Sequence, residues 1–133
     1  MPTLFTASVA GVDDSDCLVA GVAERSDGTG RELIFQAPLE PPDQQDVESG
    51  MDTYCLVTEE QGTAYGCVRE LTIDGERMRL LLRDDALEDL DLPDVAIEVR
   101  LEVDTQSLDP LREMLRRILT YGRQSARPSV LRL

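Results

Sequence analysis

Alternation of apolar and polar residues with a period of two constrains the fold of this chain more than any other feature. The clearest case is residues 95–103, where every odd-numbered position is apolar while Glu98, Arg100 and Glu102 stand between them. Successive side chains of a strand point to opposite faces, so this pattern predicts a strand with one face in the core and the other in water. Residues 77–82 repeat the pattern.

Further strands are predicted upstream, at residues 4–12, 17–24, 31–37, 53–59 and 70–73. The loops between successive strands are short, and a parallel crossover needs about a dozen residues or more, so we expect antiparallel neighbours. The fold class is therefore expected to be α+β, built on one mostly meandering antiparallel sheet of about six to eight strands.

One long helix is expected at the C-terminus, where the period of the apolar residues changes to that of a helix. Ser107 is its predicted N-cap, Pro110 lies in the predicted first turn, and Gly122 ends it. The apolar stripe that would pack on the sheet comprises Leu108, Leu111, Leu115, Ile118 and Leu119. Two short helices are expected at residues 43–49 and 84–90. With 133 residues, 41% of them hydrophobic, residues 1–133 are expected to form a single domain.

The three cysteines, Cys17, Cys55 and Cys67, are odd in number and show no CxxC spacing. This argues against both a disulfide framework and a zinc ribbon. If residues 60–62 form a three-residue hairpin loop, the pairing places Cys55 opposite Cys67. The N-terminus has no signal-peptide pattern and no apolar run is long enough to span a bilayer, so we expect a cytoplasmic protein.

The charge of the chain is unusual: 27 acidic residues face 13 basic ones, giving a net charge of −14. Every basic residue is arginine and histidine is absent, so Ser-His and Cys-His nucleophiles, imidazole bases and Schiff-base lysines are all excluded. An enzyme is therefore not expected. Surplus negative charge repels nucleic acid and membranes and attracts cationic partners. The last 22 residues hold six arginines, which we interpret as partners for helix carbonyls and for the protein's own carboxylates.

Acidic clusters at residues 13–16, 84–85 and 89–91 contain oxygen ligands suited to calcium or magnesium, but none has the order of an EF-hand loop. Solvated turns and helix starts explain them better. We expect no metal, no cofactor and no catalytic residues.

The candidate binding segment is an acidic loop followed by a strand, with a second tyrosine on the neighbouring strand. Carboxylates beside tyrosines suit a basic protein surface. The candidate contact residues are Asp43, Asp46, Glu48, Asp52, Tyr54 and Tyr65. The alternative is that either tyrosine packs in the core with its hydroxyl bonded to the backbone.

Several short motifs of this chain are similar to those of the immunity protein 10 family of bacterial polymorphic-toxin systems. They are Gln45-Asp46, Gly50-Met51-Asp52, Tyr54, Ala64-Tyr65-Gly66, Leu119-Thr120-Tyr121-Gly122, Arg127-Pro128 and Val130-Leu131. The resemblance implies a small α+β protein that binds and neutralises a cognate bacterial toxin domain and has no catalysis of its own. It carries over no catalytic residues.

The sequence therefore favours a toxin-neutralising immunity protein whose acidic surface blocks a basic toxin domain, with no nucleic acid or membrane as partner. Its oligomeric state, monomer or homodimer, is left open. The alternative is a small-ligand-binding α+β module, with Tyr54 or Tyr65 lining a pocket between helix and sheet. A metal-dependent hydrolase is the third class. A ligand module predicts a deep polar pocket, whereas an immunity protein predicts a broad, shallow acidic surface.

Overall fold

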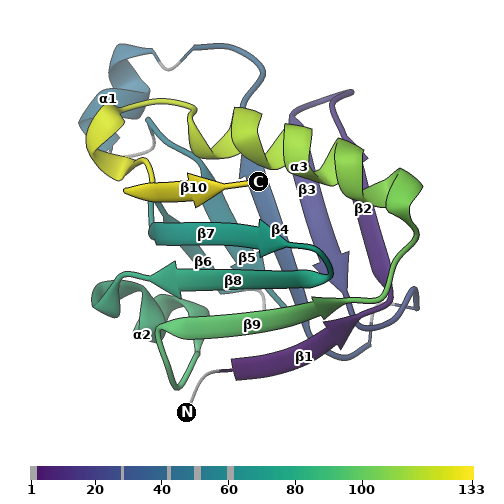
Figure 1. Cartoon of the computed structure of the whole chain (residues 1–133). Helices are drawn as coiled ribbons and strands as arrows, with labels where there is room; N and C mark the ends of the chain where they lie inside the picture. The colour runs from purple at the N-terminus through teal and green to yellow at the C-terminus, as the bar shows by residue number, and fades with distance from the viewer. Residues whose placement is uncertain (1–2, 28, 42, 50–51, 60–61) are drawn as a thin grey trace.

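Ten strands form two five-stranded sheets in the part of the chain that the computed structural model describes, which is residues 3–133 without 28, 42, 50–51 and 60–61 (Figure 1). Sheet A has the order β1 (Thr3–Ala7), β9 (Ala96–Leu101), β8 (Arg77–Leu82), β7 (Val68–Asp74), β10 (Val130–Arg132). Sheet B has the order β2 (Val9–Asp13), β3 (Leu18–Ala23), β4 (Glu32–Ala37), β5 (Cys55–Thr58), β6 (Thr63–Tyr65).

The α+β class is confirmed, but the expectation of one meandering antiparallel sheet was wrong. Sheet B is antiparallel throughout, whereas sheet A also contains two parallel pairs, β1 with β9 and β10 with β7. The single strand expected at residues 4–12 bends at Ser8, so that β1 joins sheet A and β2 joins sheet B. The Ser8 N–H and hydroxyl both bond to the end of β3, at the carbonyls of Ala23 and Glu24.

A second passage between the sheets lies at Gly66, which separates β6 from β7 and has φ +60°. Only glycine adopts this left-handed conformation without strain. A Cβ on Gly66 would also lie 2.8 Å from the Cβ of Ala126. Glycine is therefore required at this corner by both backbone conformation and packing.

The long helix α3 spans Thr105–Leu119 and buries every residue of the predicted stripe. It packs on β2, β3 and β4, on the face of sheet B that lines the core. Its N-cap is Asp104, whose side chain accepts a 2.9 Å hydrogen bond from the Ser107 N–H, so the prediction of Ser107 as N-cap was wrong. Pro110 consequently lies inside the helix and not in its first turn.

The short helices appear where they were expected. They are α1 (Gln44–Ser49), the 3₁₀ helix η1 (Asp84–Ala86) and α2 (Leu87–Leu90). A second 3₁₀ helix, η2 (Gln124–Ala126), and strand β10 follow α3 and were not predicted.

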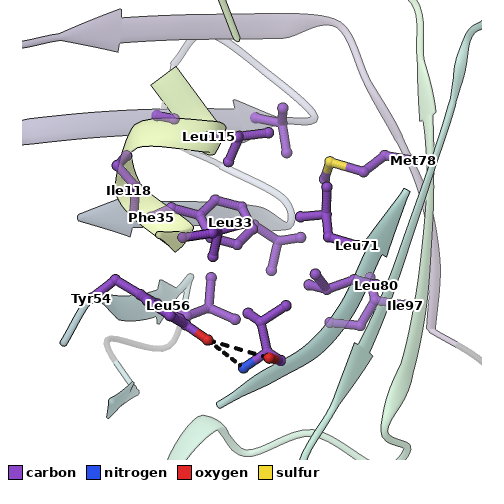
Figure 2. Close-up of a cluster of buried hydrophobic side chains, with 14 of the residues drawn as sticks. Leu33, Phe35, Tyr54, Leu56, Leu71, Met78, Leu80, Ile97, Leu115 and Ile118 are labelled. Atoms are coloured by element: carbon purple, nitrogen blue, oxygen red, sulfur yellow. Dashed lines mark hydrogen bonds between the residues drawn. The ribbon is translucent and has the colours of Figure 1, made fainter. Parts of the chain in front are cut away.

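The core lies between the two sheets and α3, as Figure 2 shows. Leu33 and Phe35 reach it from sheet B, Leu71 and Met78 from sheet A, and Leu115 from α3. The alternate positions of β8 and β9 are buried as the period of two predicts. None of the described helices is long and apolar enough to cross a membrane.

Candidate functional site

Tyr54 precedes β5 and is completely buried, so the prediction that it presents an exposed contact was wrong and the alternative holds. Its hydroxyl accepts a 3.0 Å hydrogen bond from the Val68 N–H and donates a 2.9 Å bond to the carbonyl of Ala126. Burial raises the pKa of this hydroxyl above its ordinary value, so it stays protonated. Tyr54 therefore ties together β7, η2 and the start of β5.

Asp52 is also buried, with 6% of its surface exposed. Its Oδ1 lies 2.9 Å from Nη1 of Arg123, and its carbonyl accepts a 2.9 Å bond from the Arg123 N–H. The next residue, Thr53, pairs with Gly122, where a Cβ would collide with the Asp52 carbonyl. The carboxylate and the carbonyl of Asp52 thus fasten the end of the acidic loop to the segment after α3.

The remaining acidic candidates lie at α1. Asp43 immediately precedes the helix and its side chain is exposed, as is that of Glu48, which accepts a 3.1 Å hydrogen bond from the amide of Gln44. The side chain of Asp46 lies outside what the structure describes. The other end of this loop is held by Tyr121, whose hydroxyl donates a 2.8 Å hydrogen bond to the carbonyl of Glu40.

Tyr65 is the candidate that the structure places at a surface depression, with 44% of its surface exposed. It borders an open groove of about 530 Å³. The floor of this groove is formed by sheet B, on the face of the sheet that points away from α3. The groove is lined by Asp16, Cys17, Gln36, Ala37, Pro38, Leu39, Glu40, Thr53, Cys55 and Tyr65. Because Tyr65 and Cys55 are opposite each other on this outer face, Tyr65 does not line a pocket between helix and sheet.

The pairing of the cysteines differs from the prediction. In the β5–β6 pair Cys55 faces Tyr65, two residues out of the predicted register, while residues 60 and 61 of the predicted loop lie outside the described residues. Cys55 is half-buried, its sulfur lies 3.8 Å from Oε1 of Gln36, and burial raises the pKa of its thiol. Cys67 is buried in the core, where desolvation raises the pKa of its thiol to about 12. Both thiols are therefore protonated and poor nucleophiles at neutral pH.

The described residues contain no grouping of three or more acidic or cysteine side chains that could hold a metal ion. The surface is open and shallow: a groove lined by Asp16 and Glu40, with Tyr65 and Leu39 exposed beside it. The exposed side chains of Asp43 and Glu48 lie on the loop that follows Glu40. The sequence reasoning missed the contribution of Cys17 and Leu39, whose half-exposed apolar surface depends on the sheet around them.

Comparison with known families identifies the family of this chain. The model of the family described as Immunity protein 10 matches residues 6–109, which run from β1 into the first turns of α3 and include α1, Tyr54 and Tyr65. No curated protein and no solved structure matches the chain. Since the match covers most of both sheets, the chain belongs to the immunity protein 10 family.

Proposed function

We propose that this protein is a cytoplasmic immunity protein that binds a cognate, basic toxin domain and blocks it with an acidic surface, without catalysis of its own. Membership of the family over residues 6–109 carries the proposal. The shallow groove beside Tyr65 supports it, since protein partners take broad surfaces whereas small ligands are enclosed in deep clefts.

The charge of the molecule supports a basic partner. A net charge of −14 creates a negative potential that accelerates encounter with a cationic protein. The carboxylates of Asp16 and Glu40 border the groove, and those of Asp43 and Glu48 are exposed on the adjoining loop. These charges lie at the rim of the surface, so their main effect is on the association rate and on its dependence on salt.

The contact residues that remain as proposals are Asp43, Asp46, Glu48 and Tyr65. Tyr65 contributes apolar area with few side-chain torsions to be fixed on binding, which suits a contact residue. Asp52 and Tyr54 have a different part in this proposal: they hold the loop and β5 in place beneath the contact surface.

Charge reversal tests the proposal. In the triple variant Asp43→Arg, Asp46→Arg and Glu48→Arg, association with the toxin domain encoded beside the gene is expected to slow and to lose salt dependence, and protection in co-expression is expected to fall. The matched control reverses three exposed acids away from the groove, Asp74, Glu76 and Glu88, and so changes the net charge equally.

The proposal that this surface binds the toxin is supported if the control keeps association and protection while the triple variant loses both. Equal loss of association in both variants would show that the overall charge, and not this surface, determines binding. Full protection by the triple variant would exclude the loop, and failure of the wild-type protein to bind the toxin would contradict the function itself.

A further inference from the structure

The outer face of sheet B, which points away from α3, is apolar and uncovered. In β3, β4 and β5 alternate residues are buried in the core, and their neighbours point outward at intermediate exposure. Register aligns the outward residues of β3, β4 and β5: most are apolar, with Gln36 between Val19 and Cys55, and Glu32 at the end of β4. Strand β3 is apolar on both faces, which is the pattern of a strand covered on both sides.

The outer face of sheet A is different, although the inner faces of both sheets pack in the same core. Its outward positions carry charge: Arg77, Arg79, Glu98 and Arg100 lie side by side on β8 and β9. Nε of Arg79 lies 3.3 Å from Oε1 of Glu98. The sequence therefore makes one outer face suited to water and the other suited to contact.

Two glycines sit opposite each other on the apolar face, Gly11 in β2 and Gly21 in β3. Neither is required by the fold: a Cβ on Gly11 would meet nothing within 4 Å, one on Gly21 would make ordinary contacts at 3.7 Å and beyond, and neither has a positive φ. Glycine inside a strand weakens the strand, and one reason to keep it is the close approach of another molecule to the backbone.

These glycines line a second shallow groove, of about 310 Å³. This groove and the groove beside Tyr65 lie on the same outer face of sheet B. The charged lining residues of this second groove are Asp13 and Glu32, as those of the first groove are Asp16 and Glu40. No arginine is among the described residues that line these two grooves, whereas arginines line each of three other depressions on the molecule. The apolar face thus has an acidic rim.

We propose that the outer face of sheet B is the main docking surface for the toxin, which seats an apolar side chain over Gly11 and Gly21 and places lysines or arginines against the acidic rim. This inference rests on the proposed function and assigns the apolar part of its contact. The acidic rim selects a basic protein, since it repels anionic membranes and nucleic acid. The charges of the rim raise the association rate, and the apolar contacts at the centre lower the dissociation rate.

Filling the glycine groove is the direct test. Gly11→Val adds a side chain where the structure leaves space, and valine favours a strand, so the thermal midpoint is expected to stay the same or rise. Binding to the toxin domain encoded beside the gene is expected to weaken by about tenfold or more, mainly through faster dissociation. Thr72→Val on the outer face of sheet A is the control and is expected to bind as the wild type does.

A second pair of variants places a cation on each face. Ile34→Arg on sheet B is expected to weaken binding by about tenfold or more. Leu81, on sheet A, is also half-exposed, and Leu81→Arg is expected to leave binding unchanged. Wild-type binding together with unaltered binding of Gly11→Val would overturn this inference and leave the proposed function standing. Absence of wild-type binding would contradict the proposed function, and this inference with it.

Discussion

At the scale of single residues, the hydroxyl of Tyr54 holds more of the fold than its position beside an acidic loop suggests. It bonds to a backbone N–H of β7 and a backbone carbonyl of η2, segments that are 58 residues apart in the chain, Val68 and Ala126. Both backbone groups are buried, and an unpaired buried polar group destabilises a protein by about 1–3 kcal/mol. Tyr54 is thus a structural residue.

Tyr54→Phe removes this hydroxyl while keeping the ring in the core. The free energy of unfolding is expected to fall by about 1–3 kcal/mol, because the Val68 N–H and the Ala126 carbonyl lose their partner. Urea unfolding measures the change, and Tyr65→Phe on the exposed tyrosine serves as control, with no change expected. Unaltered stability of Tyr54→Phe would show that water or a neighbour replaces the hydroxyl.

At the scale of elements, α3 covers the end of the core between the sheets with its apolar stripe. Leu115 is completely buried, and Figure 2 shows it near Phe35 of sheet B. Truncating such a leucine leaves a cavity in a packed interior, so Leu115→Ala is expected to lower the free energy of unfolding by about 2–5 kcal/mol. Arg116→Ala on the exposed side of the helix is the control. An unchanged thermal midpoint for Leu115→Ala would mean that α3 is not docked.

The strands and their buried faces could be predicted because the alternation of residues is local. Their grouping into two sheets could not, because the change of sheet at Ser8 leaves the apolar alternation intact: residues 4–12 look like one strand. The parallel pairing of β10 with β7 depends on where α3 returns the chain, and β10 itself is only three residues long.

The candidate site was predictable only in part, because the exposure of each residue depends on segments that are distant in the sequence. Tyr65 is 44% exposed because it pairs with Cys55 on the outer face of sheet B, whereas Tyr54 is completely buried on the same side as Leu56. Asp52 looked like a surface acid, but its side chain is buried and forms an ion pair with the half-exposed Arg123, 71 residues further on. The apolar outer face of β3 was visible in the sequence as a run without polar residues, Leu18–Ala23.

At the scale of the whole molecule, charge and apolar surface are separated in a way that suits binding to a basic protein. One outer sheet face carries paired arginines and glutamates, and the other carries apolar residues with acids at its ends. The net charge of −14 extends the attraction beyond contact distance, over about one Debye length, roughly 8–10 Å at moderate salt. Family membership supports a toxin-immunity role, and this surface suits the binding of a basic protein.

In the proposed function this protein inactivates its toxin by direct stoichiometric binding. The most direct measurement is the activity of the purified toxin domain encoded beside the gene, followed while this protein is added in increasing amounts. Activity is expected to fall linearly and to be abolished near equimolar protein, with no change in the toxin's covalent structure. Full toxin activity in the presence of a large excess of the folded protein would contradict it.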